Sequence, residues 1–443
     1  MNILEVIEKK KYGKTLTNEE IDFFIQGYSR NEIPDYQISS LLMAIWFRGM
    51  NEEETANLTN SMVYSGQIID LSKINGIKVD KHSSGGVADT VTLPLVAIIA
   101  ANDIPVAKMS GRGLGHTGGT IDKLESIPGF KVEIPVEEFI EIVNRVKGAV
   151  ISQSEEVALA DKKLYALRDV TGTIDSIPLI ASSIMSKKIA SGSDAIVLDV
   201  KVGNGAFMQN LEDAIELSKT MVNIGNSLGK ETVAYITDMN EPLGDAIGNA
   251  IEVEEAIEVL KGKSYKKLFA VIETLGAEIM RMAGKASDLN EGKAIVGNTI
   301  RNGAALKKFS EIVQAQGGNP DVINDMKLLP QAKFQIPLYS DSSGYLASVR
   351  TKEIGLLAAY LGAGREKKGD SIDLSVGIYF RKKIGDRIDK GEVIGEILAN
   401  DIEKVNVALN QMKGLFTLSE KIISPKKVIY CRVSKEGIEH YST

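Results

Sequence analysis

Residues 110–125, SGRGLGHTGGTIDKLE, combine five glycines with hydroxyl and cationic side chains. An earlier segment, residues 79–93 (VDKHSSGGVADTVTL), has the same character. Glycines let the backbone approach a ligand without Cβ clashes, and backbone N–H groups with hydroxyls and a lysine make an anion site. If the two segments follow neighbouring strands, they can surround one small anion. This pattern predicts chemistry on phosphate itself, not merely binding of a phosphorylated cofactor.

In the first segment Lys81 supplies a point charge and Ser83 a hydroxyl, and Asp89 is expected to cap the helix that follows. His82 lies inside this segment, where a histidine can donate a proton to a reacting group. Two alternatives stay open, because glycine segments also form plain strand-to-helix turns and histidines in polar turns often only make hydrogen bonds. His116, in the second segment, is expected to be such a turn residue more than a proton donor.

The second segment begins where Lys108 and Ser110 end an expected strand, and it leads to Thr117 and Thr120. Its other charged residues are expected to pair with one another rather than with a ligand: Arg112, Asp122 and Glu125. The segment also contains G-x-G-x-x-G at Gly113, Gly115 and Gly118, so a dinucleotide oxidoreductase is an alternative. That match is weak, because the glycines begin several residues after the strand and no acidic residue closes a clear βαβ unit about 20 residues on.

A third group of polar residues lies in residues 165–188, YALRDVTGTIDSIPLIASSIMSKK. Ser183 and Lys187 are four residues apart, so a helix places them on one face, while Lys188 points elsewhere. Arg168 precedes them across a turn at residues 171–173. A hydroxyl, an ammonium and a guanidinium together suit a planar ligand with carbonyl acceptors. The alternative is a solvated polar helix face.

Composition limits the classes of function. The 443-residue chain carries a formal net charge of −7, so bulk charge does not attract it to nucleic acid or to an anionic membrane. Cys431 is the one cysteine, so no disulfide framework forms and a reducing compartment is expected. No His/Cys cluster has the spacing of a zinc site, and no apolar run is long enough to cross a bilayer. These features predict a cytoplasmic protein.

The order of predicted elements indicates an α/β fold. The first ~65 residues are expected to be helical, with a capping box at Thr17 and Glu20 and a further helix that begins at Asn51. After residue 66, short apolar runs alternate with glycine segments and helices, which indicates a largely parallel sheet. The expected strands are residues 77–79, 105–109, 195–200 and 233–237. Ligands of such sheets bind at the carboxyl ends of the strands, where both glycine segments then lie.

Three domains are expected. Residues 1–65 and 164–193 are assigned to a discontinuous helical domain, residues 70–163 and 194–330 to a phosphate-binding α/β domain, and residues 331–443 to a C-terminal α+β domain. Residues 371–397 read as short strands joined by turns at residues 385–386 and 390–391, similar to the barrel-sandwich fold of biotinyl and lipoyl carriers. They lack the lysine between methionines that a carrier modifies, so this domain is expected to be structural.

Together the three polar segments resemble the thymidine phosphorylase and pyrimidine-nucleoside phosphorylase family over nearly the whole chain. The resemblance implies a helical domain hinged to a larger α/β domain, with the active site in the cleft between them, and a homodimer. It implies that the pyrimidine is held by Arg168, Ser183 and Lys187, and that His82, Arg168 and Lys187 are catalytic. The phosphate ligands that it implies are Lys81, His82, Ser83, Thr92, Lys108, Met109, Ser110 and Thr120.

The family also has members with a monovalent cation site, expected to hold K⁺, near the first glycine segment. Its positions correspond here to Ala88, Thr90, Leu243, Ala246 and Glu255. The chain departs from the family at Ala88, where glycine is usual, and alanine resists a positive φ. A second departure, Ser84 in place of the usual threonine, keeps the hydroxyl.

The implied reaction is reversible phosphorolysis of uridine, thymidine or deoxyuridine, with inorganic phosphate as co-substrate and no organic cofactor. Phosphate attacks C1′ through an oxocarbenium-like state, and the base leaves as an anion that Arg168 and Lys187 would stabilise. His82 would protonate a base carbonyl. Lys108 could reach the ribose edge, which favours an enzyme that accepts both uridine and thymidine.

Three alternative functions make different demands on the sequence. An anthranilate-type phosphoribosyltransferase shares the related fold. However, the glycine-aspartate sequence that usually ends its phosphate loop is not seen here, and its reaction has no use for Arg168 and Lys187. A non-catalytic nucleoside-binding protein is disfavoured because Lys81, Arg168 and Lys187 are intact. The oxidoreductase would require nicotinamide binding.

Overall fold

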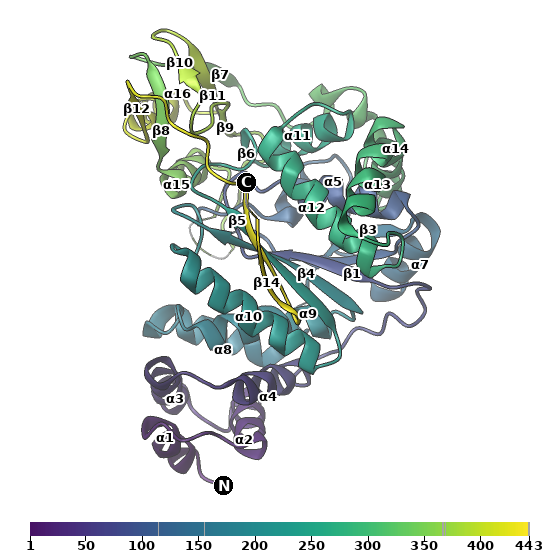
Figure 1. The fold of residues 1–443 in the computed structure, drawn as a ribbon, viewed down its shortest axis with the longest axis vertical. Coiled ribbons are helices and arrows are strands. Elements are labelled where there is room, and N and C mark those ends of the chain that lie inside the picture. Colours follow the sequence, from purple (N-terminus) through teal and green to yellow (C-terminus); the bar gives the residue numbers. More distant parts are fainter. Residues whose placement is uncertain (114, 155, 366, 368, 442–443) are drawn as a thin grey trace.

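The computed structural model describes residues 1–113, 115–154, 156–365, 367 and 369–441. Four N-terminal helices form a bundle at one end of the molecule (Figure 1): α1 (Ile3–Lys11), α2 (Asn18–Ser29), α3 (Asp35–Arg48) and α4 (Glu52–Val63). Both expected helix starts are confirmed, since Thr17 with Glu20 and Asn51 with Glu54 form capping boxes. Each box satisfies two backbone N–H groups that a helix N-terminus otherwise leaves without partners.

Two later helices join this bundle, namely α8 (Leu159–Thr171) and α9 (Ile177–Ala190). Ala160, Leu164 and Leu179 lie in the same hydrophobic core as the apolar residues of α1–α4. Farther along α9, Ala181 and Met185 pack instead in the core between the central sheet and α10 (Leu211–Ser227). Helix α9 therefore bridges the helical bundle and the α/β region.

The central sheet has the order β1-β4-β5-β13-β14. Strands β1 (Val79–Ser83), β4 (Ala195–Val202) and β5 (Glu231–Asp238) are parallel, as the alternation of elements predicted. The last two strands, β13 (Ile429–Ser434) and β14 (Gly437–His440), come from a part of the chain expected in the C-terminal domain, and β13 pairs antiparallel with β5. The end of the chain thus completes the central sheet (Figure 1).

The expected strand at residues 77–79 was placed too early, because β1 runs from Val79 to Ser83. Lys81, His82 and Ser83 are therefore strand residues, and buried partners for Asp80 and Lys81 let these polar residues stay in a strand. The other expected strands are confirmed to within two residues at each end. Strand β3 (Gly148–Ser152) was not expected; it pairs in parallel with β2 (Val106–Ser110) in a separate two-stranded sheet.

Helices cover both faces of the central sheet (Figure 1). Helix α10 packs on one face against β4 and β5, and α12 (Lys266–Met282) packs on the other, with α5 (Thr92–Ala101) beside it. Around these lie α6 (Thr120–Glu125), α7 (Val136–Val146), α11 (Ala250–Leu260), α13 (Leu289–Arg301) and α14 (Ala304–Ala315), followed by short 3₁₀ turns at Pro320–Ile323 and Met326–Leu328. No helix among the described residues is long and apolar enough to cross a membrane.

The C-terminal region is built from two small antiparallel sheets and two helices. One sheet contains β9 (Gly377–Phe380), β11 (Val393–Ala399) and β7 (Phe334–Tyr339), with β6 (Ala246–Gly248) from the α/β region at its edge. The other contains β10 (Arg387–Ile388), β8 (Gly344–Val349) and β12 (Phe416–Ser419), and the helices are α15 (Thr351–Leu361) and α16 (Ile402–Met412). The expected turns are present, with positive φ at Gly385 and Gly391. The whole is an α/β protein with a helical bundle and an α+β C-terminal unit, as predicted.

Candidate active site

One buried lysine connects strands β1 and β2. The Lys108 ammonium donates to Asp80 Oδ1 at 2.9 Å and to the Lys81 carbonyl at 2.7 Å. This contact joins the two segments that were predicted to bind one anion, although β1 and β2 belong to separate sheets. Burial lowers the pKa of Lys108 to about 8, even though Asp80 opposes this change. The two predicted anion-binding segments therefore lie side by side.

Lys188 binds the second oxygen of the Asp80 carboxylate. Its ammonium donates to Asp80 Oδ2 at 2.9 Å and to the Met109 carbonyl at 3.2 Å. Burial alone would raise the pKa of Asp80, but Lys108 and Lys188 outweigh it and hold that pKa below its usual value. Asp80 is thus ionised and bound between two lysines from different elements.

Lys81 lies in a second buried group of charges. Its ammonium is 3.4 Å from Asp199 Oδ2 and 3.9 Å from Asp89 Oδ2, and it has no hydrogen-bond acceptor among the residues that the structure describes. Lys201 is 2.8 Å from the same Asp199 oxygen. A buried ammonium without an acceptor is costly, and an anionic ligand would provide one.

Asp89 does not cap a helix, so that expectation was wrong. Helix α5 begins after Val91 without a side-chain cap, and Asp89 Oδ2 instead accepts a 2.5 Å hydrogen bond from the Ser83 hydroxyl. Burial would raise the pKa of Asp89, but Lys201 and Lys81 hold it below the usual range. The Asp89 carboxylate therefore orients the Ser83 hydroxyl and balances the positive charges of Lys81 and Lys201.

The remaining predicted phosphate ligands surround these groups. Thr92 and Thr120 are the first residues of α5 and α6, and both line one small cavity. Thr92 also lines a second cavity together with Lys81 and Lys108. Ser110 ends β2, where its carbonyl accepts from the Gln153 backbone N–H. The fold therefore gathers residues from four separate elements into one region.

His82 is half-buried at the end of β1. Burial, followed by the charges of Lys188 and Lys108, holds its pKa well below the ordinary value. The imidazole is consequently neutral at neutral pH in the ligand-free protein. A phosphate dianion nearby would favour the protonated form and raise this pKa.

The second polar face is present on α9. The Lys187 ammonium donates to Ser183 Oγ at 2.9 Å, which confirms that the two residues share a helix face. It also forms a short ion pair with Asp161 of α8, a residue that was not predicted. The other oxygen of Asp161, Oδ1, is buried and has no hydrogen-bond partner among the described residues. Asp161 therefore holds Lys187 in place.

The Arg168 guanidinium forms hydrogen bonds with backbone carbonyls. It donates to the carbonyls of Thr173, Ile174 and Leu179 at 3.2, 2.7 and 3.0 Å. These contacts fix the turn between α8 and α9. A guanidinium has five N–H groups, so two are left for a ligand. Burial lowers the pKa of Arg168, though nearby Asp161 opposes the shift.

The glycine segment at residues 110–125 is held by its own charges. Arg112 contacts Glu125 at 2.5 and 2.8 Å and Asp122 at 3.3 Å, so the expected internal ion pairs are confirmed. A Cβ on Gly119 would collide with the backbone nitrogen of Gly113, so the close approach of these two parts of the loop requires glycine. Leu114 of this segment lies outside the described residues.

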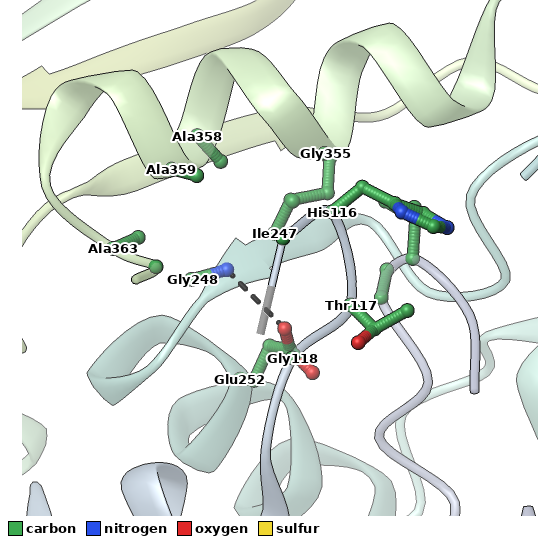
Figure 2. Close-up of a pocket in the computed structure, with 14 residues that line it drawn as sticks. His116, Thr117, Gly118, Ile247, Gly248, Glu252, Gly355, Ala358, Ala359 and Ala363 are labelled. Atoms are coloured by element: carbon green, nitrogen blue, oxygen red, sulfur yellow. Dashed lines mark hydrogen bonds between the residues drawn. The ribbon is translucent and has the colours of Figure 1, made fainter. Parts of the chain in front are cut away.

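His116, Thr117 and Gly118 face the C-terminal region across a small pocket (Figure 2). Its opposite wall comes from α15, with Gly355, Ala358 and Ala359, and Glu252 of α11 lies at its base. Burial, followed by the charge of Lys352, lowers the pKa of His116. This pocket thus joins the second glycine segment to the C-terminal unit.

The expected cation positions lie around Glu255. Its carboxylate accepts from the Thr90 hydroxyl at 3.1 Å and from the Ala246 backbone N–H at 3.3 Å, and the Ala88 carbonyl accepts from Gly244 N at 3.0 Å. The Leu243 backbone N–H bonds to the Val87 carbonyl at 3.2 Å. Burial, with added repulsion from Asp245 and Glu252, raises the pKa of Glu255 to about 8. The five residues are brought together.

Several charged residues of the site were not predicted from the sequence, although the sequence around some of them indicated a buried charge. Asp199 and Lys201 interrupt the apolar run of β4, every residue of which is buried. Charged residues in a fully buried parallel strand must have partners, so their presence there could have indicated a buried charge cluster. Asp80 and Asp161 had no such local signal, because their partners are distant in sequence.

Three family models match the chain. They are the glycosyl transferase family, helical bundle domain, over residues 4–66, the glycosyl transferase family, a/b domain, over residues 75–306, and the pyrimidine nucleoside phosphorylase C-terminal domain over residues 345–419. The order of the three matches follows the helical, α/β and C-terminal regions of the fold.

Curated relatives are similar over almost the full length. The pyrimidine-nucleoside phosphorylase of Staphylococcus aureus strain MSSA476 is 55% identical over 425 residues, which cover 96% of this chain and 98% of the relative. The one from the bovine strain RF122 / ET3-1 is 54% identical over the same coverage. Anthranilate phosphoribosyltransferase from Thermus thermophilus has a TM-score of 0.58 at 18% identity, covering 70% of this chain and 98% of that one. This last likeness concerns the fold alone.

Proposed function

Because the chain belongs to the pyrimidine-nucleoside phosphorylase family, we propose that it catalyses the reversible phosphorolysis of uridine, thymidine and deoxyuridine. Inorganic phosphate is the second substrate, and the products are a pentose 1-phosphate and the free pyrimidine base. The family is one of glycosyl transferases, so the enzyme is a pentosyltransferase.

The observation that carries this proposal is the junction of β1 and β2 beside α9. Lys108 connects the two strands, and Lys188 connects them to the helix that bears Ser183 and Lys187. The proposed oxyanion site and the proposed donors for carbonyl groups therefore share one region. Phosphorolysis requires this pairing, because the phosphate must reach C1′ while the base is held as a leaving group.

In this proposal Lys81 and Ser83 bind the phosphate, along with Thr92, Ser110 and Thr120 and the backbone around His82 and Met109. The Lys187 ammonium and the free N–H groups of Arg168 meet the negative charge that develops on the departing base, which is the electrostatic contribution expected to dominate. His82 becomes a proton donor only after phosphate binding raises its pKa, because the free imidazole is neutral.

The donors near Glu255 fit the K⁺ ion that the family resemblance implies. The Thr90 hydroxyl, the Glu255 carboxylate and the backbone carbonyls are oxygen ligands of the kind that hard cations prefer. Burial, with repulsion from Asp245 and Glu252, raises the pKa of Glu255 to about 8, and a cation beside the carboxylate would lower it. A bound cation would supply this positive charge. Ala88, Thr90, Leu243, Ala246 and Glu255 would surround it.

We also propose a cytoplasmic homodimer. Large apolar side chains are exposed on the helical bundle and the adjoining α8, namely Tyr36, Phe47, Trp46 and Val170. Exposed apolar groups of this kind mark protein interaction sites. A monomer mass measured by light scattering would contradict the homodimer.

The direct test mixes the protein with phosphate and either uridine or thymidine and follows free base by ultraviolet absorbance. Base release that depends on phosphate is expected with both nucleosides. A reaction without phosphate would indicate a hydrolase, and no reaction with either nucleoside would refute the proposal. Uridine and thymidine differ in both base and sugar, so the ratio of the rates with uridine and deoxyuridine measures the sugar preference, in which Lys108 is expected to take part.

A further inference from the structure

One carboxylate connects the two halves of the site. Asp80 is only 4% exposed, and each of its oxygens accepts a hydrogen bond from a different lysine at 2.9 Å. Lys108 comes from β2 and Lys188 comes from α9. Both lysines also donate to backbone carbonyls of proposed phosphate-binding residues, namely Lys81 and Met109.

Lys188 lies on α9 directly after Lys187, so this contact links the phosphate-side strands to the helix of the proposed nucleobase site. Lys187, the preceding residue, turns toward Ser183 and Asp161 on the proposed nucleobase side. Lys188 points to a different side of the helix and reaches the proposed phosphate-binding strands. Adjacent residues of one helix thus contact the two subsites, and a shift of α9 against β1 would change the distance between them.

We propose that Asp80 and Lys188 are positioning residues that set the distance between the phosphate and nucleobase subsites. This inference rests on the proposed phosphorolysis. The two residues hold α9 against β1 and β2, so that phosphate and nucleoside are aligned for attack at C1′. A misplacement of about 1 Å in such an alignment can cost on the order of hundredfold in rate.

The test replaces Lys188 with methionine. The Asp80–Lys108 ion pair stays complete in this variant, so the buried carboxylate keeps a counter-charge. Turnover is expected to fall at least about tenfold, and toward roughly the hundredfold of a misplaced reactant. Binding of inorganic phosphate alone and of uracil alone, measured by calorimetry, is expected to change less than about threefold. Lys188→Arg keeps the charge and should retain more turnover than Lys188→Met.

The matched control is Lys10→Met. Lys10 and Glu54 form an ion pair of similar burial and length, 2.7 Å, inside the helical bundle and away from the site. This control should lose stability in thermal unfolding but keep its turnover. If Lys188→Met does not fold, Asp80→Asn and Lys188→Arg are measured in the same way.

Two results would overturn the inference. Unchanged turnover in Lys188→Met would show that the contact does not align the subsites. A loss of phosphate affinity as large as the loss of turnover would make Lys188 a phosphate ligand instead. Absence of phosphorolysis by the unaltered protein would instead refute the proposed function. That outcome differs from the two above, which both require an active unaltered protein.

Discussion

The lysines of the site differ in what holds their ammonium groups. Lys187 is fixed by Asp161 and Ser183, whereas Lys81 has only carboxylates at 3.4 Å and beyond. A fixed ammonium can stabilise a charge that develops in the transition state, and an ammonium without an acceptor can bind an anion in the ground state. The two substitutions should therefore affect different kinetic constants.

Lys187→Ala is expected to lower kcat by roughly 10²–10³-fold, the usual effect of removing a transition-state donor. The KM for phosphate should change less than about threefold, because Lys187 lies on the proposed nucleobase side. Steady-state kinetics with thymidine measures both constants. The control is Lys219→Ala, an exposed residue of α10. Equal losses in kcat and in phosphate binding would contradict the assigned role.

Lys81→Ala should weaken phosphate binding more than it lowers turnover. A hydrogen bond to a charged group contributes about 1.5–3 kcal/mol, so the KM for phosphate should rise roughly 10–100-fold. The KM for the nucleoside should change little. Lys201 remains to offset Asp199 in this variant, which favours a folded protein. An unchanged phosphate saturation curve would show that Lys81 does not bind phosphate.

His82 makes the stability depend on pH. Its pKa in the folded protein lies well below the ordinary value, while the unfolded chain titrates near about 6.5. Below that pH the unfolded chain binds a proton that the folded chain does not, so stability falls as pH decreases. The loss is up to about 1.4 kcal/mol per pH unit for one such group.

Urea unfolding at pH 7.5 and pH 5.5 measures this effect. The unaltered protein should lose more stability between the two conditions than His82→Asn does. Other groups act in both proteins alike: the lowered pKa of His116 adds to the loss on acidification, whereas the pKa of Glu255, raised to about 8, opposes it. The difference between the two proteins therefore reports on His82. An identical loss in both proteins would mean that His82 is accessible to protons in the folded state.

At the scale of elements, the loop between β1 and α5 has an unfavourable residue. Ala88 has φ +55° and is buried, and its carbonyl accepts from Gly244. An alanine in the left-handed region costs roughly 1–2 kcal/mol. The loop keeps this backbone conformation because the Leu243 and Gly244 backbone N–H groups donate to the carbonyls of Val87 and Ala88.

Ala88→Gly should therefore be neutral or stabilising. Relief of the left-handed strain offsets the lost methyl burial and the greater freedom of glycine in the unfolded chain, each about 0.4–1 kcal/mol. The matched control is Ala97→Gly in the buried helix α5, which should cost about 1–2 kcal/mol. Equal destabilisation of both variants in urea unfolding would contradict the strain at Ala88.

Two helix-borne predictions depended on local spacing and were correct. Ser183 and Lys187 share a face because four residues make about one turn of α9, and the caps at Thr17 and Asn51 involve only residues three apart. The strand predictions were less accurate at their ends. Whether Asp80 and Lys81 could remain in β1 depended on lysines and carboxylates supplied by other elements.

At the scale of the whole molecule, one buried ion pair joins the C-terminal strand β13 to helix α12, which covers the central sheet. Glu278 of α12 is fully buried and accepts from Arg432 of β13 at 2.8 Å and from the Tyr235 hydroxyl of β5 at 2.5 Å. Arg281 also donates to it at 2.8 Å. Burial, with the charge of Glu278, raises the pKa of Tyr235, so the hydroxyl stays a donor.

Arg432→Met should lower the free energy of unfolding by about 3 kcal/mol, because it leaves a buried carboxylate with a weaker set of partners. The control Arg387→Met removes an exposed ion pair with Asp389 and should cost no more than about 0.5 kcal/mol. Urea unfolding compares the two. A cost below about 1 kcal/mol for Arg432→Met would show that Arg281 alone compensates Glu278.

By itself the sequence determined the helix caps at Thr17 and Asn51, the glycine segments, the alternation of strands and helices and the family, because each depends on residues near one another in the chain. Only the tertiary structure decided which charges pair. Asp80 and Lys188 are 108 residues apart, and Arg432 and Glu278 are 154 apart. A buried carboxylate takes whichever cation the fold brings within about 3 Å, and that choice depends on how distant elements pack.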